Sequence, residues 1–135
     1  MGDSLEDKVI RFPGGIPGFP DHERFVLVEL VPDGAFHELR CVDDPDIAML
    51  VTVPWLFFPE YAPVLSDDEQ VELGIESASD ATLFCAVNID EESESLHVNL
   101  LGPFIVNQET RTGRQLVLAG SDYPARATVQ LTVAS

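Results

Sequence analysis

The sequence contains no lysine or arginine between Arg40 and Arg111, a stretch of about half the chain. The same stretch carries many acidic residues, and the formal net charge of the chain is −17. The acidic residues of this stretch are Asp43, Asp44, Asp46, Glu60, Asp67, Asp68, Glu69, Glu72, Glu76, Asp80, Asp90, Glu91, Glu92, Glu94 and Glu109. So acidic a surface repels nucleic acid and attracts basic proteins. We therefore predict a protein that binds proteins and makes no direct contact with nucleic acid.

Cysteine is also scarce, and the two that occur, Cys41 and Cys85, show no Cys-x-x-Cys or metal-ligand spacing. Alternation places Cys85 on one face of a strand with Leu83, Val87 and Ile89, where we predict that it packs as a small apolar side chain. A disulfide between the two cysteines is open in principle. In a reducing compartment we expect two free thiols instead.

No apolar run approaches the roughly 18–20 residues that a membrane span needs. The N-terminus has no basic-then-apolar signal pattern. We therefore expect a cytoplasmic protein with no membrane partner. With 45% hydrophobic residues in a chain of 135, enough apolar surface is available to fold a single domain over residues 1–135.

The arrangements that carry catalysis or hold cofactors are missing as well. His22, His37 and His97 lie in separate segments without metal-ligand spacing, and no Gly-x-Ser-x-Gly sequence occurs. The glycine-rich segment 13–18 lacks the Gly-Lys-Ser/Thr end of a phosphate loop. The acidic segment 43–46 lacks the later glutamate of a calcium loop. We predict no enzyme activity, no cofactor and no metal site.

What the sequence does contain is a series of short strand patterns separated by Gly-, Pro- and Asp-rich turns. The predicted strands span residues 8–12, 24–31, 36–42, 47–53, 81–89, 95–100, 103–107, 114–119 and 127–133. Turns are expected at 13–18, at 32–34 and at Thr112-Gly113. Many short strands with one short helix predict a mainly β fold, either a small antiparallel barrel or a sandwich.

The one helix is predicted near residues 66–73. Ser66 is followed three residues later by Glu69, which is the pattern of a capping box. Acidic residues fill the first turn, where the helix dipole favours them. Gly74 provides the left-handed residue that ends many helices.

Residues 55–61, Trp-Leu-Phe-Phe-Pro-Glu-Tyr, hold four of the eleven aromatic side chains. Pro54, Pro59 and Pro63 interrupt sheet pairing, so an edge or a structured loop is expected here. Two interpretations remain open. The segment either plugs one end of the fold, or it presents an aromatic anchor surrounded by acids at a protein interface.

Five blocks resemble, in the same order, those of the FliW family of flagellar assembly factors. They are residues 10–19 (IRFPGGIPGF), 43–46 (DDPD), 57–61 with 65–69 (FFPEY and LSDDE), 98–107 (VNLLGPFIVN) and 121–124 (SDYP). No single block is specific, but five in register are. Together they extend over about residues 9–126.

The resemblance implies a small antiparallel β-barrel-like domain without catalytic activity. It also implies two protein partners, the RNA-binding translational repressor CsrA, which the protein would antagonise non-competitively, and flagellin. Flagellin that accumulates would occupy the protein and release CsrA, which would stop flagellin synthesis. The alternative is a flagellin-binding export chaperone without a CsrA role.

The shared blocks and the aromatic segment supply the candidate partner-binding residues. These are Asp43, Asp44, Asp46, Phe58, Glu60, Tyr61, Asn99, Asn107 and Arg111. A capped turn would explain the three aspartates equally well. Asn99 and Asn107 could instead hold the Gly102-Pro103 bend by hydrogen bonds to its backbone.

The start of the chain departs from the family pattern. Family members usually begin with an additional strand, which residues 1–7 do not show. We therefore expect that strand to be shortened or missing. A bare sheet edge would then be available for weak self-association.

Overall fold

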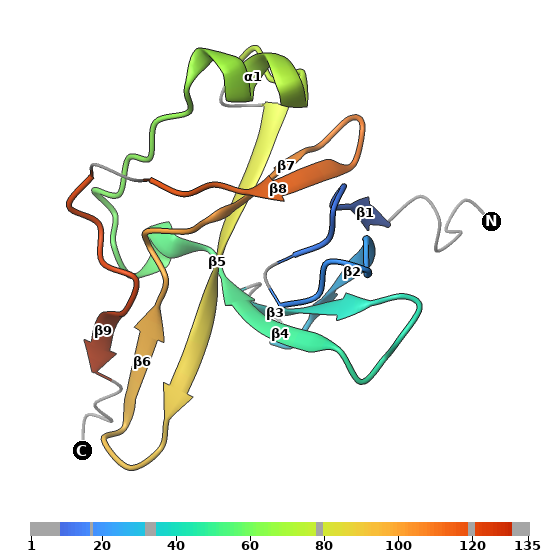
Figure 1. Ribbon diagram of the computed structural model, residues 1–135. Coiled ribbons are helices and arrows are strands. Elements are labelled where there is room, and N and C mark those ends of the chain that lie inside the picture. Colours follow the sequence, from blue (N-terminus) through green and yellow to red (C-terminus); the bar gives the residue numbers. More distant parts are fainter. Residues whose placement is uncertain (1–8, 17, 32–34, 78–79, 119–120, 131–135) are drawn as a thin grey trace.

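The computed structural model describes residues 9–16, 18–31, 35–77, 80–118 and 121–130. The described residues form nine strands, a 3-10 helix and one α-helix (Figure 1). In chain order these are β1 (Ile10–Arg11), β2 (Arg24–Glu29), β3 (Phe36–Cys41), β4 (Ala48–Thr52), η2 (Pro54–Leu56), α1 (Asp67–Leu73), β5 (Ala81–Asp90), β6 (Ser95–Val98), β7 (Phe104–Asn107), β8 (Thr112–Gln115) and β9 (Ala127–Gln130).

Seven of the strands close into a ring. They are hydrogen-bonded in the order β4-β3-β2-β1-β8-β7-β5, and β4 pairs with β5 to complete the circuit. The pairs are antiparallel except for β1 with β8, which run parallel. The predicted mainly β, barrel-like fold is therefore confirmed, as a ring with one parallel pair.

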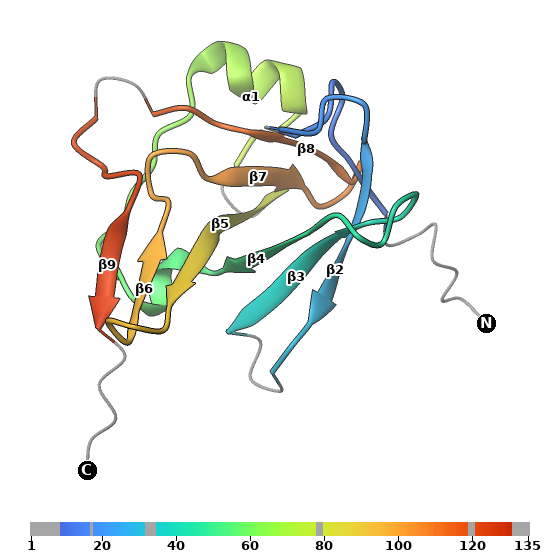
Figure 2. The ribbon, with the colours of Figure 1, turned by 60° about the horizontal axis from the view of Figure 1, so that its bottom comes forward.

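The long strand β5 connects the ring to a second sheet. Its first residues, Ala81–Phe84, pair with β7, and its last residues, Val87–Asp90, pair with β6. β9 pairs with the other side of β6, so β6 and β9 stand outside the ring (Figure 2).

Two apolar clusters lie on opposite faces of β5 and β7. Phe84 and Phe104 belong to the cluster that includes Phe12 and Phe25, whereas Leu83 and Ile105 belong to the other. Within the first cluster Phe104 contacts Phe12 edge-to-face at 5.8 Å and stacks on Phe84 at 5.5 Å between ring centroids. Both faces are therefore buried along β7 and at residues 83–85 of β5.

The predicted helix and its caps are confirmed. Ser66 Oγ accepts a hydrogen bond from the Glu69 backbone N–H, and Glu69 Oε1 accepts one from the Ser66 N–H. Gly74 ends the helix with a φ of 69°. Glu72 forms an ion pair with Arg114 of β8 at 2.7 Å, which ties α1 to the ring.

All nine predicted strands are present, but β8 lies earlier than the predicted 114–119. Thr112 and Gly113 were predicted to form a turn, and they are strand residues. Packing explains the difference, because a Cβ on Gly113 would lie 2.9 Å from a ring carbon of Phe12. The turn instead includes Arg111, whose φ is 60°.

Three predictions of side-chain burial were wrong. Ile89 was predicted to face the core and is 54% exposed, because β5 has left the ring at this point. The alternation of residues 95–100 predicts that Ser95 faces outward with His97 and Asn99, but Ser95 is buried, with its hydroxyl 2.6 Å from that of Ser93. The nearly continuous apolar run at 47–53 predicts a strand covered on both faces, but Ala48 is exposed.

Cys41 and Cys85 are both buried free thiols and belong to different clusters. Burial raises the pKa of the Cys85 thiol to about 12. The nucleophilic thiolate is therefore negligible at neutral pH.

Some predictions fall on residues outside the described part of the chain. These are the missing strand within 1–7, the turn at 32–34 and residues 131–133 of the last predicted strand. β1 is paired on both sides, by β2 and β8, so the ring has no bare edge there. In the described part of the chain the outer side of β9 is an open edge. No helix among the described residues is long and apolar enough to cross a membrane.

Candidate protein-binding surface

The aspartates at 43, 44 and 46 form the turn between β3 and β4. Asp43 accepts a hydrogen bond from Arg24 at 3.1 Å, and Asp44 Oδ1 accepts one from the Asp46 N–H at 3.2 Å. The turn is therefore capped by its own side chains. It lies on one side of the molecule, whereas the segment that follows η2 lies on the other (Figure 1).

The two asparagines have different structural roles. Asn99 Oδ1 accepts a hydrogen bond from the Gly102 N–H at 2.9 Å and so holds the bend, as one of the two interpretations expected. Asn107 does not act on the bend. Its Nδ2 donates to Leu73 O at 2.7 Å and to Gly74 O at 3.3 Å, which ties the end of α1 to β7.

The aromatic segment combines a buried and an exposed part. Tyr61 is buried, and its hydroxyl donates to Leu100 O at 2.6 Å. Burial raises the Tyr61 pKa above its ordinary value, so this hydroxyl stays protonated. Trp55 is 41% exposed, and its Nε1 donates to Tyr61 O. Phe58 is half-buried and Glu60 is exposed.

Basic residues from both ends of the chain meet on β1, β2 and β8. Arg11 and Arg24 are cross-strand partners, and Arg11 also lies beside Thr112 in the parallel pair. Arg24 and Arg114 each form an ion pair with a carboxylate of the same chain. Arg111 lies in the turn that precedes β8. Much of this positive charge is thus neutralised within the molecule.

Residues 62–65 run along the outside of the molecule between η2 and α1 (Figure 1). We call this segment the Val64 ridge. Two hollows lie beside it and share some of its residues as lining. The first, the Ile105 hollow, has a volume of about 480 Å³ and is lined mainly by apolar side chains, among them Ile75, Leu83 and Ile105. The second, the Tyr123 hollow, has a volume of about 530 Å³ and includes Val117.

The ridge itself exposes apolar surface. Val64 is 79% exposed and lines both hollows, and Val117 on the far side of the second hollow is 68% exposed. Sequence reasoning missed both residues. Val64 lies outside every predicted strand, helix and shared block. Val117 lies within the predicted strand 114–119, where its apolar neighbours Leu116 and Leu118 gave no indication that it is exposed.

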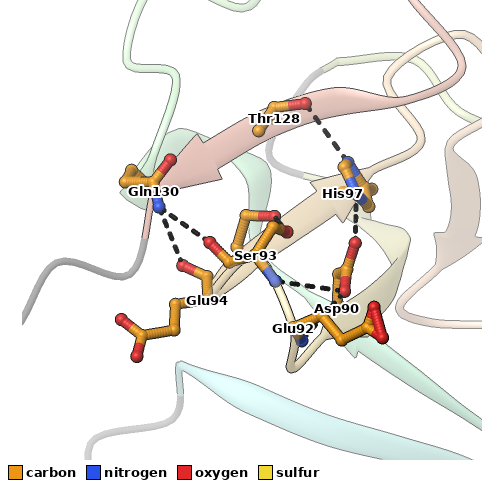
Figure 3. Close-up of polar contacts among 8 residues, drawn as sticks. Asp90, Glu92, Ser93, Glu94, His97, Thr128 and Gln130 are labelled. Carbon is orange, nitrogen blue, oxygen red and sulfur yellow. Dashed lines mark hydrogen bonds and ion pairs between the residues drawn. The ribbon is translucent and has the colours of Figure 1, made fainter.

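The turn between β5 and β6 carries a second group of acids, and it is held by polar contacts (Figure 3). Asp90 Oδ1 accepts hydrogen bonds from the N–H groups of Glu92 at 3.1 Å and Ser93 at 3.4 Å. The other carboxylate oxygen lies 4.0 Å from Nε2 of His97, and Nδ1 of His97 lies 3.2 Å from the Thr128 hydroxyl.

β9 supports the same turn from its far end. Gln130 Nε2 donates to the backbone oxygens of Ser93 at 3.0 Å and Glu94 at 3.2 Å (Figure 3). Glu94 has a φ of 53°, a left-handed conformation that is uncommon outside glycine. The turn therefore keeps its acids in a defined position.

The Asp90 contacts predict a dependence of stability on pH. Hydrogen bonds from Ser93 lower the pKa of Asp90, with smaller contributions from Glu92 and His97. A lowered pKa in the folded state stabilises the fold above the unfolded pKa of about 3.9. That stabilisation is lost as pH falls through the folded pKa. We expect Asp90→Asn to be less stable than wild type at pH 6, with the difference shrinking below about pH 4.

Urea unfolding of the two proteins between pH 3 and pH 7 would measure this difference. Exposed Glu91, substituted by Gln in the same turn, is the matched control. The stability difference between Glu91→Gln and wild type is not expected to follow the pH dependence of Asp90→Asn. A difference for Asp90→Asn that stays constant over the whole range would contradict the assignment.

Among the described residues, no group of three or more His, Cys, Asp or Glu side chains is placed to hold a metal ion. The hollows around the Val64 ridge are apolar and bordered by acids. Glu76 lines the Ile105 hollow and Glu69 lines the Tyr123 hollow. Such a surface suits contact with a protein better than it suits chemistry on a small molecule.

Known proteins resemble this chain both in sequence and in fold. The family model of the FliW protein matches residues 3–129. The flagellar assembly factor FliW of Symbiobacterium thermophilum is 36% identical over 121 residues, which is 89% of this chain and 88% of that protein. Its counterpart in Moorella thermoacetica is 38% identical over 119 residues, which is 87% of this chain and 75% of that protein. A crystal structure of the flagellar assembly factor FliW has a TM-score of 0.84 at 26% identity, covering 98% of this chain and 91% of that one.

Proposed function

The chain belongs to the FliW family of flagellar assembly factors, and we propose on this basis that it is a non-catalytic regulator of flagellin synthesis in the cytoplasm. In this proposal it binds the translational repressor CsrA and antagonises it non-competitively. It also binds flagellin, so that the two partners exchange. Flagellin that accumulates releases CsrA and stops further synthesis, and secretion of flagellin reverses the effect.

The observation that carries the proposal is the charge distribution. The formal net charge is −17, and no lysine or arginine occurs between Arg40 and Arg111. An RNA-binding protein presents positive potential to phosphate. An acidic body docked beside that surface lowers the potential and repels RNA, without occupying the RNA site itself. This accounts physically for antagonism that is not competitive.

Titration calorimetry of this protein with CsrA of the same organism tests the proposal. We expect binding that is abolished when the protein is first saturated with flagellin. Because the attraction is largely electrostatic, raising the salt concentration from 50 to 500 mM should weaken CsrA binding on the order of tenfold. Binding of CsrA that does not change with salt would contradict the electrostatic mechanism.

The alternative function is a flagellin export chaperone without a CsrA role. The exposed apolar surface of the Val64 ridge favours this alternative, because a chaperone covers apolar parts of its client. Heat from flagellin with none from CsrA would support it.

Self-association stays a prediction, and the outer side of β9 is the described edge that could support it.

A further inference from the structure

We propose that the Val64 ridge and its two hollows form the docking site for a basic segment of the partner, one that inserts an apolar side chain flanked by lysine or arginine. The inference rests on the proposed function, which supplies CsrA as the basic partner. It adds the face of the molecule that CsrA contacts and the residue at its centre.

The first argument is shape and exposure. The ridge separates two hollows of about 480 and 530 Å³, both of which it lines with Ala62 and Val64. Val64 is 79% exposed, Trp55 at one border is 41% exposed, and Val117 at the other is 68% exposed. Exposed apolar side chains that gather around concave surface, instead of being scattered singly, mark interaction sites.

The second argument is charge. None of the residues that line either hollow is lysine or arginine. Glu69 and Glu76 lie on the lining. Glu60 is exposed in the turn before the ridge, and Asp67 and Asp68 are exposed in the first turn of α1. An apolar centre with an acidic rim is complementary to an apolar side chain between cations. It disfavours an acidic partner, since like charges would be brought together.

The third argument is rigidity. The segment before the ridge is anchored by Tyr61, which packs edge-to-face on Tyr123 at 4.7 Å between ring centroids. The Tyr123 hydroxyl accepts a hydrogen bond from the Ala62 N–H at 3.0 Å, and Gln70 Nε2 donates to Leu65 O at 3.2 Å. Both ends of the ridge are thus fixed before any partner binds. A preorganised site loses less conformational entropy on binding than a flexible one.

Between these anchors the backbone of the ridge is open. The Val64 N–H makes no hydrogen bond within the described chain, and Pro63 has no N–H to donate. An extended partner segment can therefore add main-chain hydrogen bonds to the side-chain contacts. No residue of the acidic turns at 43–46 and 90–94 lines either of the two hollows, so these turns serve less well as the anchor point.

Substitution of Val64 by lysine tests the inference. Because Val64 is 79% exposed, the fold should tolerate the change, which circular dichroism and urea unfolding would verify. We expect Val64→Lys to weaken CsrA binding about tenfold or more in titration calorimetry, since it removes the apolar contact and repels the partner's cations. Val64→Ala, which removes apolar surface without a charge, should weaken binding by about threefold.

Val71→Lys is the matched control. Val71 is 82% exposed on α1 and lines neither hollow. Its replacement by lysine changes the net charge by the same amount as Val64→Lys. The affinity of Val71→Lys for CsrA should stay within about twofold of wild type. Equal losses for both lysine variants would indicate a general charge effect and overturn the inference.

The remaining outcomes separate this inference from the proposed function. If wild type binds CsrA and Val64→Lys binds equally well, the docking site is wrong and the proposed function stands. If Val64→Lys loses flagellin binding but keeps CsrA binding, the ridge is assigned to flagellin and the inference is overturned. If wild type does not bind CsrA at all, the proposed function and the inference both fail.

Discussion

Replacing Phe104 with alanine should lower the free energy of unfolding by about 3–5 kcal/mol. Phe104 is 1% exposed and lies at the centre of the aromatic cluster, between the rings of Phe12 and Phe84. Its removal leaves a cavity in a closed ring of strands, which cannot collapse easily around the gap. Because small domains are stable by only about 5–15 kcal/mol, this single change would take a large share of the total.

Urea unfolding followed by circular dichroism measures the loss, read as a lower midpoint at constant slope. Phe104→Leu keeps an apolar side chain at the same position and should lose clearly less than the alanine variant. Val117→Ala removes an exposed apolar side chain and should change stability by less than about 0.5 kcal/mol. A loss below about 1 kcal/mol for Phe104→Ala would show that the ring repacks around the cavity.

Replacing Asn107 with alanine should cost about 2–4 kcal/mol, although it removes little apolar surface. Asn107 is buried and connects two elements that are far apart in the sequence. Its Nδ2 donates to the carbonyls of Leu73 and Gly74, and its Oδ1 accepts from the N–H groups of Glu109 and Thr110. The alanine variant leaves these backbone groups, whose hydrogen bonds to Asn107 are buried or partly buried, without their partner.

Asn107→Asp distinguishes the two halves of this contact. One carboxylate oxygen can still accept from Glu109 and Thr110, but the other would face the carbonyl oxygens of Leu73 and Gly74 and repel them. We expect the aspartate variant to expose the end of α1 in hydrogen exchange while the turn before β8 stays protected. Asn99→Ala, which loses one hydrogen bond to Gly102, should cost only about 1 kcal/mol.

The Asn107 variants also bear on function, because Asn107 was a candidate for partner contact. A structural role predicts that binding falls only as far as folding does. Wild-type stability combined with weakened CsrA binding would restore the candidate to the interface. The same comparison applies to Tyr61, whose buried hydroxyl bonds to Leu100 O.

Features that depend on neighbours in the sequence were predicted well. The helix at Asp67–Leu73 follows from Ser66, Glu69 and Gly74, which act on backbone groups within a few residues. The strands follow from alternation, which requires one covered face and one open face. Where contacts with residues distant in the sequence decide the structure, the observed bounds of an element differ from the predicted ones. β8 starts early because Gly113 must lie against the ring of Phe12.

The candidate site was harder to predict for the same reason. The turn at 43–46 was expected either to cap itself or to contact a partner, and the structure shows the capping contacts. Tyr61 and Asn107 were candidates as polar or aromatic residues of shared blocks. Both side chains are buried and form hydrogen bonds to backbone carbonyls of the same chain. A sequence block does not reveal whether its residues serve folding or binding.

The sequence by itself determined the family, the mainly β fold, the capped helix and the acidity of the molecule, because these depend on composition and on interactions between nearby residues. Only the tertiary structure decided which apolar side chains remain exposed. Val64 borders hollows whose walls come from residues as distant as Ile105 and Tyr123. Exposure depends on which distant segments pack together, and a local pattern of residues carries no record of that packing.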